Sequence, residues 1–336
     1  MQILITGTAG FIGFHLARRL LADGHEVVGF DGLTPYYDVR LKQARQRILQ
    51  QYPRFRAVTG MLENADLVRS TVAGFAPEIV LHFAAQPGVR YSFEHPETYV
   101  ASNFTGTFNL LEALRAAPPR HLIVASTSSI YGANPSVAFR ETERTDFPLS
   151  IYAATKSAAE AMTHAYAHLF AIPTTAARLF TVYGPWGRPD MAAFRFASAI
   201  TRGTSIDVYA NGAMSRDFTY IDDLVEALAR LIARPPVIGA PMGPVDSLSP
   251  VAPWRSVNVA GGHPVPLLDF IAAFETAIGK PAIRNNLPMQ PGDVASTNAD
   301  TTLLRALIGY VPATPVTEGV AAFVDWYRNE WPATQT

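Results

Sequence analysis

The chain has 336 residues, of which 49% are apolar, so it can bury a large core in one domain or two. Its formal net charge of −1 argues against a broad electrostatic surface for nucleic acid, and the absence of cysteine excludes disulfides, thiolate catalysis and cysteine-ligated zinc. The apolar run near the N-terminus is too short for a membrane span and lacks the basic region and cleavage site of a signal peptide. We therefore expect a cytoplasmic protein that binds neither nucleic acid nor a membrane and that holds no metal.

The first residues predict a strand, a glycine-rich turn and a helix, in that order. The apolar run Ile3–Ile5 is followed at once by glycines spaced Gly-x-x-Gly-x-x-Gly, and a helical pattern begins at Phe11. Gly7 allows a tight turn, Gly10 lets the backbone approach a pyrophosphate, and Gly13 lets the helix pack closely on the strand. This order forms a phosphate cradle at a helix N-terminus, although three glycines also occur in a purely structural turn.

The residues after this loop favour a dinucleotide site over a structural turn. Gly24 can end the first helix, and Glu26–Phe30 predicts a second strand that ends at Asp31. An acidic residue about 20 residues beyond the glycines can bind the hydroxyl pair of a ribose. Because a carboxylate there repels the extra phosphate of NADP, the expected cofactor is NAD.

Strands and helices alternate through the first half of the chain, which predicts a parallel sheet with helices on both faces. The fold class that we expect is α/β, a Rossmann-type doubly wound parallel sheet. Ala84 is a small residue at a strand end and allows a ligand to lie across the sheet edge, whereas His82 is interpreted as a core histidine. Further strands are expected at Phe55–Val58, Ile79–Phe83, His121–Ala125 and Thr174–Phe180, with helices at Ala65–Phe75 and Tyr99–Ala116 and a polar helix containing Lys42, Arg45 and Arg47.

Hydroxyl groups and a tyrosine–lysine pair supply the candidate chemistry. The run Ser126–Ser129 ends a strand, where its hydroxyls can bind a polar substrate or simply form a polar turn. Ser150 can cap a helix on which Tyr152 and Lys156 are four residues apart, so both side chains share one face. A nearby ammonium lowers the pKa of a phenol, which lets the phenolate act as a base near neutral pH. Lys156 can also hold the nicotinamide ribose.

Beyond residue 180 the alternation weakens and prolines increase, which suggests a second unit. We expect residues 1–180 to form the dinucleotide-binding domain, with later segments returning to it, and residues 181–331 to form a smaller α/β domain for the substrate. The segment 181–190 is interpreted as a loop, and residues 235–253 as a long surface loop. Arg188 and Arg216 can bind an anionic sugar nucleotide at the sheet edge or can be ordinary surface ion partners.

With these motifs in place, the chain resembles the extended short-chain dehydrogenases/reductases of the nucleotide-sugar epimerase branch, and among them the UDP-glucuronate 4-epimerases. The resemblance runs from Met1 to about Trp331. The stretches that carry it are Gly7–Gly13, Thr34–Asp38 with Leu41-Lys42, Gln86–Ser92, Tyr152-x-x-x-Lys156, Phe180–Met191 and Ser249–Pro253. Most of the family has Asn where Thr181 stands.

The resemblance implies a catalytic triad and an NAD site. Thr127, Tyr152 and Lys156 form the triad, and the implied reaction is a transient oxidation at C4 of the sugar. The implied cofactor residues are Gly7, Gly10, Phe11, Ile12, Gly13, Asp31, Ala84 and Lys156. The family usually places Asp after the glycine that ends the third strand, where it binds adenine, but here Gly60 is followed by Met61.

The resemblance also implies how a UDP-sugar and a second subunit are held. Ser128, Ser129 and Thr181 are expected at the sugar carboxylate, Arg90 near the phosphates, and Arg188, Arg216 and Asp293 at the UDP part. Many relatives pair through two helices in a four-helix bundle, which here are Tyr99–Ala116 and Tyr152–Phe170. We therefore expect a homodimer.

Other activities on the same fold remain open at this point. A 4,6-dehydratase carries Asp-Glu after the strand-end Thr, and a UDP-glucuronate decarboxylase carries Glu where Ser129 stands, whereas this chain has Ser128-Ser129. A 4-epimerase of UDP-glucose or UDP-N-acetylglucosamine is a closer alternative. A non-catalytic NAD-binding regulator is the alternative from another class.

Overall fold

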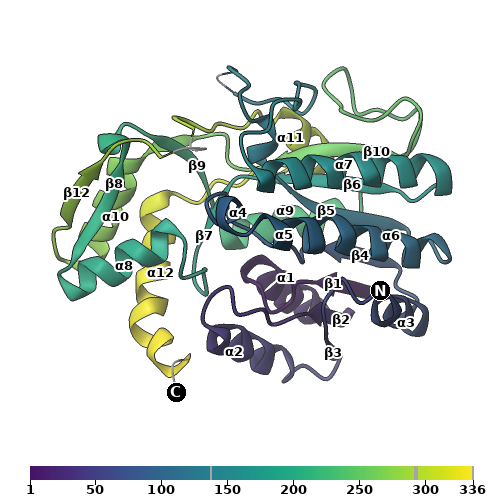
Figure 1. The fold of residues 1–336 in the computed structure, drawn as a ribbon, viewed down its shortest axis with the longest axis horizontal. Coiled ribbons are helices and arrows are strands. Elements are labelled where there is room, and N and C mark those ends of the chain that lie inside the picture. Colours follow the sequence, from purple (N-terminus) through teal and green to yellow (C-terminus); the bar gives the residue numbers. More distant parts are fainter. Residues whose placement is uncertain (137, 291–293, 335–336) are drawn as a thin grey trace.

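A seven-stranded parallel sheet forms the centre of the computed structural model, which describes residues 1–136, 138–290 and 294–334 (Figure 1). The strand order is β10-β6-β5-β4-β1-β2-β3, and every neighbouring pair is parallel. The strands are β1 (Gln2–Thr6), β2 (Glu26–Asp31), β3 (Phe55–Thr59), β4 (Ile79–His82), β5 (His121–Thr127), β6 (Thr174–Leu179) and β10 (Trp254–Val259). The chain order reverses between β1 and β4, so the expected doubly wound fold is confirmed.

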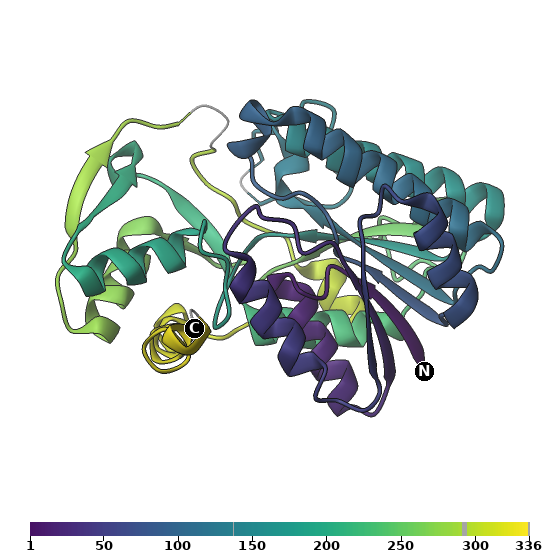
Figure 2. The ribbon, with the colours of Figure 1, turned by 60° about the horizontal axis from the view of Figure 1, so that its bottom comes forward.

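Helices cover both faces of this sheet because alternate strand residues point to opposite sides. Ile3 and Ile5 contact one apolar cluster, and Leu4 contacts the other. The first face is covered by α1 (Phe11–Ala22), α2 (Val39–Leu49), α9 (Ile221–Ile232) and α11 (Thr302–Ile308). The second is covered by α3 (Ala65–Phe75), α6 (Gly106–Arg115) and α7 (Ile151–Phe170). Figure 2 shows the two helical layers above and below the sheet.

The helical run expected at Tyr99–Ala116 is divided into three parts. It consists of α5 (Pro96–Tyr99), a π-helical segment η1 (Val100–Thr105) and α6, preceded by the short helix α4 (Tyr91–Glu94). Gly106 begins α6, where a β-carbon would lie 2.7 Å from Cβ of Leu62, so tight packing at this glycine is confirmed. Asn103 in the π-helical segment exchanges two hydrogen bonds with the backbone of Gln86, at 2.7 and 3.1 Å. A π-helical segment at this place thus ties the helix to the cleft described below.

Two small sheets and three helices lie beside the large sheet. One sheet has the order β11-β9-β7 and the other pairs β12 with β8. Their elements are β7 (Thr181–Tyr183), α8 (Ala192–Arg202), β8 (Ser205–Tyr209), β9 (Ser215–Tyr220), β11 (Pro264–Pro266), α10 (Leu267–Ile278), β12 (Ile283–Leu287) and α12 (Val316–Asn329). The expectation of a loop over 181–190 is wrong at its start, because Thr181–Tyr183 pairs in parallel with Phe218–Tyr220.

The long loop over residues 235–253 is confirmed, since it contains no helix or strand. It is held by the buried ion pair of Asp246 with Arg255, at 3.2 Å. Within the described ranges, none of the helices combines the length and the apolar character that crossing a membrane requires.

Candidate active site

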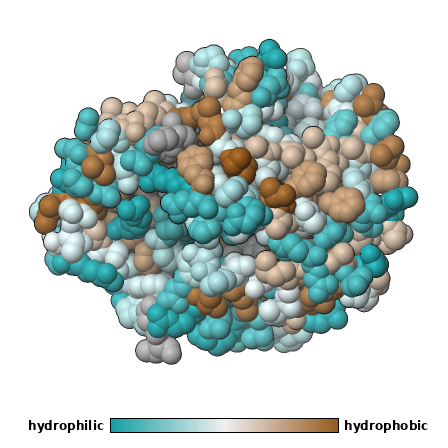
Figure 3. Space-filling view, in the orientation of Figure 1, coloured by the Kyte–Doolittle hydropathy of each residue, from teal (hydrophilic) through white to brown (hydrophobic). Residues whose placement is uncertain are grey.

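A cleft of about 1070 Å³ lies at the carboxyl edge of the large sheet. The ends of β1, β2, β4, β5 and β6 form one wall, and β7, α8 and β9 contribute the other. Ligands bind at this edge of doubly wound sheets, where the strand order reverses. In the space-filling view of Figure 3, a hollow lies near the middle of the face that Figure 1 presents.

The glycine-rich loop has the shape that a pyrophosphate requires. Gly7 has a φ of +83°, and a β-carbon on it would lie 2.7 Å from the backbone nitrogen of Ala84. A β-carbon on Gly13 would collide with the carbonyl oxygen of Gly7, so only glycine lets α1 approach the loop. The first turn of α1 therefore presents its backbone N–H groups and the positive end of its dipole to the cleft.

Asp31 at the end of β2 lies where a ribose would be bound. Its Oδ2 accepts a hydrogen bond from the backbone N–H of Ala9 at 2.9 Å, and its Oδ1 accepts one from Leu33 at 2.8 Å. Both bonds fix the carboxylate at the cleft wall, next to the glycine-rich loop. Phe11, Ile12 and Ala84 line the same part of the cleft. These residues fit a dinucleotide.

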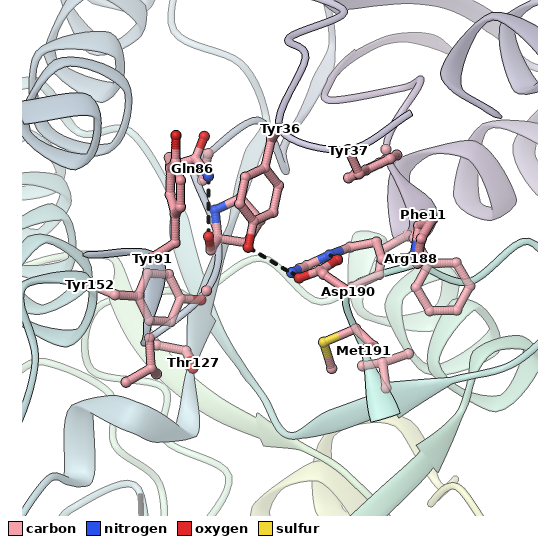
Figure 4. A pocket seen from close by; sticks show the side chains of 18 of the residues that line it. Phe11, Tyr36, Tyr37, Gln86, Tyr91, Thr127, Tyr152, Arg188, Asp190 and Met191 are labelled. Carbon is pink, nitrogen blue, oxygen red and sulfur yellow. Dashed lines mark hydrogen bonds and ion pairs between the residues drawn. The ribbon is translucent and has the colours of Figure 1, made fainter. Parts of the chain in front are cut away.

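Tyr152 and Lys156 lie on the first turns of α7, and both reach the cleft beside the end of β5 (Figure 4, which labels Tyr152 and Thr127). The Ser150 hydroxyl caps α7 by accepting a bond from Ala153 N–H at 3.1 Å, as the sequence predicts. Lys156 Nζ donates to the carbonyl oxygen of Ala125 at 2.7 Å, and burial lowers the pKa of Lys156 to about 8.

The phenol of Tyr152 is influenced by different neighbours from those that the sequence suggests. Burial raises the pKa of Tyr152, and contacts with the Thr127 hydroxyl and the Arg188 charge oppose that rise. The Lys156 ammonium donates its hydrogen bond to the strand backbone, at the carbonyl oxygen of Ala125. Thr127 Oγ1 in turn accepts a bond from Ser129 N–H at 3.2 Å and donates to Ser129 Oγ at 3.3 Å.

The facing wall carries a compact polar cluster around Arg188 (Figure 4). Arg188 binds Asp190 through two contacts, Nε–Oδ1 at 3.0 Å and Nη2–Oδ2 at 2.5 Å. The Tyr36 hydroxyl donates to Asp190 Oδ2 at 3.1 Å, and burial raises the pKa of Tyr36 to about 12. Burial opposes the ionisation of Asp190, but the Arg188 guanidinium keeps the pKa of that carboxyl below its usual range. Arg188 therefore lies inside the cleft rather than on an open surface.

The remaining substrate residues expected from the sequence also line the cleft, as far as the structure describes them. Arg90 places its guanidinium 4.3 Å from the centre of the Tyr209 ring, and Arg216 Nη1 donates to the carbonyl oxygen of Ser215 at 2.8 Å. Ser128, Ser129 and Thr181 also line the cleft. Asp293 lies outside the described residues.

Two cations of α2, the predicted polar helix, lie inside the protein. Lys42 and Arg45 are buried, and Arg45 is 0% exposed. Arg45 Nη1 donates to the carbonyl oxygen of Ala9 at 2.8 Å, and its Nη2 donates to that of Trp186 at 2.6 Å. It thus connects the glycine-rich loop to the loop that carries Arg188. Sequence reasoning missed this role, because a cation that satisfies distant backbone carbonyls leaves no local pattern.

Asp190, Tyr36 and Tyr91 were also missed as cleft residues. All three line the cleft, and the Tyr36 and Tyr91 rings lie 4.9 Å apart. The only sequence signal for them was their position in the stretches Thr34–Asp38, Gln86–Ser92 and Phe180–Met191.

Comparison with known proteins agrees with this geometry. Residues 3–241 match the model of the NAD dependent epimerase/dehydratase family. The chain belongs to this family. A probable UDP-glucuronate 4-epimerase of Rhizobium meliloti (strain 1021) is 55% identical over 339 residues, covering 100% of this chain and 99% of the relative. UDP-glucuronate 4-epimerase 6 of Arabidopsis thaliana is 41% identical, covering 97% of this chain and 71% of the relative.

A solved structure of a family member has the same fold throughout. The UDP-glucuronic acid 4-epimerase of Bacillus cereus, in complex with UDP-glucuronic acid and NAD, superposes with a TM-score of 0.87 at 33% identity, covering 98% of this chain and 99% of that one. The similarity therefore includes both walls of the cleft.

Proposed function

We propose that this protein catalyses the NAD-dependent epimerisation of UDP-glucuronate at C4, giving UDP-galacturonate through a 4-keto intermediate. The observation that carries the proposal is that one cleft brings Tyr152, Lys156 and Thr127 together with the glycine-rich loop on one side and the Arg188 cluster on the other. The similarity along the whole chain to UDP-glucuronate 4-epimerases supports the choice of substrate.

The cofactor in this proposal lies along the glycine-rich loop. The N–H groups at the start of α1 would hold the pyrophosphate, Asp31 the adenosine ribose and Lys156 the nicotinamide ribose. When bound, NAD supplies the redox chemistry, accepting hydride from C4 of the sugar and later returning it. The fixed Asp31 carboxylate supports NAD over NADP, because a second phosphate there would meet a like charge.

Tyr152 is the proposed acid–base group. Its phenolate, a form that burial opposes and that the Thr127 hydroxyl and the Arg188 charge favour, takes the proton of the C4 hydroxyl as the C4–H bond breaks, and the phenol returns it after the sugar has turned. Thr127, whose hydroxyl lowers the pKa of Tyr152, is proposed to orient the phenol. Arg188 and Arg216 anchor the UDP part, so that the sugar presents its two faces in turn without leaving the cleft.

The Ser128, Ser129 and Thr181 hydroxyls are proposed to restrain the sugar carboxylate. Oxidation at C4 produces a β-keto acid, which loses carbon dioxide readily. Hydrogen bonds from hydroxyl groups stabilise the carboxylate charge and oppose the charge movement that decarboxylation requires. Positions 128 and 129 carry no carboxylate that could assist elimination or decarboxylation, which favours the epimerase over the dehydratase and the decarboxylase.

The proposal assigns the two walls to two parts of the chain. Residues 1–180 form the NAD-binding domain, to which β10 returns by pairing with β6, and residues 181–331 mainly form the UDP-sugar-binding domain. We also propose a homodimer in the cytoplasm, paired through the run α5–η1–α6 and α7. Phe104 and Phe108 on that run are 42% and 43% exposed, and Figure 3 shows hydrophobic side chains over this region. Large exposed aromatic side chains favour a buried contact with a second subunit.

Product analysis tests the proposal. The protein is purified, and its bound nucleotide is released by denaturation and identified. It is then incubated in turn with UDP-glucuronate, UDP-glucose and UDP-N-acetylglucosamine, and the products are followed by NMR. The expected results are bound NAD or NADH and conversion of UDP-glucuronate to UDP-galacturonate with little pentose. The proposal would be contradicted by a pentose product or by equal efficiency on UDP-glucose. If no UDP-sugar were turned over, the protein would be a non-catalytic NAD-binding protein instead.

A further inference from the structure

The part of the cleft beyond Asp31 has an apolar wall made by the residues that follow β3. Gly60, Met61 and Leu62 line the cleft there, opposite Gly32. The Met61 side chain is 39% exposed, and its sulfur lies against Gly32, where a β-carbon would collide with it. In a doubly wound fold the pyrophosphate lies at the N-terminus of α1 and the adenosine ribose at the end of β2. The base of a bound dinucleotide must therefore lie beyond Asp31, along this wall.

The carboxylate oxygens of Glu63 and Asp31, which line the cleft beside this wall, are either hydrogen-bonded within the protein or buried. Glu63 Oε1 accepts a hydrogen bond from Ser102 Oγ at 2.8 Å, whereas Glu63 Oε2 is buried and has no hydrogen-bond partner among the described residues. Both oxygens of Asp31 accept bonds from backbone N–H groups, and the proposed partner of this carboxylate is the ribose rather than the base. In the part of the chain that the structure describes, this wall therefore has no carboxylate oxygen that is both exposed to the cleft and without a hydrogen bond. No such oxygen is placed to accept a hydrogen bond from the exocyclic amine of adenine.

We infer that Met61 holds the cofactor's base by packing alone, so that the site does not recognise the 6-amino group of adenine through a hydrogen bond. A thioether is polarisable and packs favourably on an aromatic ring, but it does not act as a strong hydrogen-bond acceptor. A site that uses only such contacts discriminates weakly between two bases of the same shape, whereas a site that binds a polar group through a partner rejects analogues without that group. This inference rests on the proposed NAD site and defines its specificity.

Competition between two dinucleotides tests the inference through occupancy rather than activity. The purified protein is exchanged against mixtures of NAD and the NAD analogue whose base is unsubstituted purine, which lacks only the 6-amino group. After desalting, bound nucleotides are released by denaturation and counted by chromatography. The expected ratio of affinities is below about threefold. In Met61→Asp, which introduces an acceptor for the amine, the preference for NAD should rise by about tenfold or more. The isosteric control Met61→Leu should retain the wild-type ratio.

Two results would overturn the inference. A preference for NAD of tenfold or more in the wild type would mean that the site recognises the 6-amino group. Loss of that preference in Glu63→Gln would identify Glu63 as the residue that binds it. An unchanged ratio in both Met61→Asp and Met61→Asn would mean that the base does not lie against residue 61. Failure to retain either dinucleotide would instead contradict the proposed function, so the two failures are distinguishable.

Discussion

The substitution Glu160→Gln tests how the fold keeps Lys156 charged. Glu160 lies one turn beyond Lys156 on α7 and is buried with Arg178 of β6, their side chains being 9% and 5% exposed. Its carboxylate accepts hydrogen bonds from Arg178 Nε at 3.1 Å and Nη2 at 2.9 Å, and from Ser126 Oγ at 2.5 Å. Glutamine keeps the shape of the side chain but removes its charge, which leaves the Arg178 cation buried without its partner.

The expected loss of stability follows from this burial. Breaking a buried ion pair on one side costs about 3–5 kcal/mol. For a chain of 336 residues the entropy of unfolding is about 0.7 kcal/mol per kelvin, so the Tm should fall by about 4–7 °C. Glu275→Gln is the matched control, because Glu275 pairs at 3.2 Å with the more exposed Arg284. There the Tm should fall by at most about 2 °C.

The same substitution should move the pH dependence of turnover. Burial lowers the pKa of Lys156 to about 8, and the Glu160 charge opposes that shift. Turnover that requires the Lys156 ammonium is therefore lost as the pH rises through about 8, and this loss should begin at lower pH in Glu160→Gln. Turnover of UDP-glucuronate is measured from pH 6 to 10 in the wild type and both variants. The reasoning would be refuted if turnover at high pH were lost at the same pH in Glu160→Gln as in the wild type, and if the Tm of Glu160→Gln changed no more than that of Glu275→Gln.

Three other predictions concern single side chains. Tyr152→Phe should lower turnover by about 10² to 10⁴ while the Tm is retained, and near-normal turnover would show that another group is the base. Thr181→Ala or Ser128→Ala should raise the decarboxylated share of product or weaken uronate binding by about tenfold, because a hydrogen bond to a charged group is lost; NMR showing an unchanged product ratio and affinity would contradict it. Burial raises the pKa of Glu141 to about 7, so the unfolded chain loses this proton first, and the contribution of Glu141 to wild-type stability should fall by about 3 kcal/mol between pH 4.5 and 7. Urea titrations at the two pH values should therefore show that the change in stability differs by about this amount between the wild type and Glu141→Gln; equal changes in both proteins would count against it.

The sequence by itself determined the features that depend on short spacings. The glycines at positions 7, 10 and 13, the strand ending at Asp31 and the pair Tyr152 and Lys156 each follow from a local pattern of turn, strand or helix. The alternation of apolar strands with amphipathic helices was sufficient to predict the doubly wound parallel sheet, and the observed strand order confirms that fold class. These features are local because they depend on backbone conformation and on which residues share one face of an element.

Tertiary structure alone decided how distant residues complete the cleft. The sequence predicts that later segments return to the first domain, but only the structure shows that β10 does so, by pairing with β6. Thr181–Tyr183 becomes a strand only because β9 lies beside it. The pairing of Tyr36 with Asp190 joins residues 154 positions apart, and Arg45 links carbonyl groups of two loops. A sequence shows which side chains can form such bonds, but not which ones meet. Their partners are fixed by the packing of helices on the sheet, and their ionisation by the burial that this packing produces.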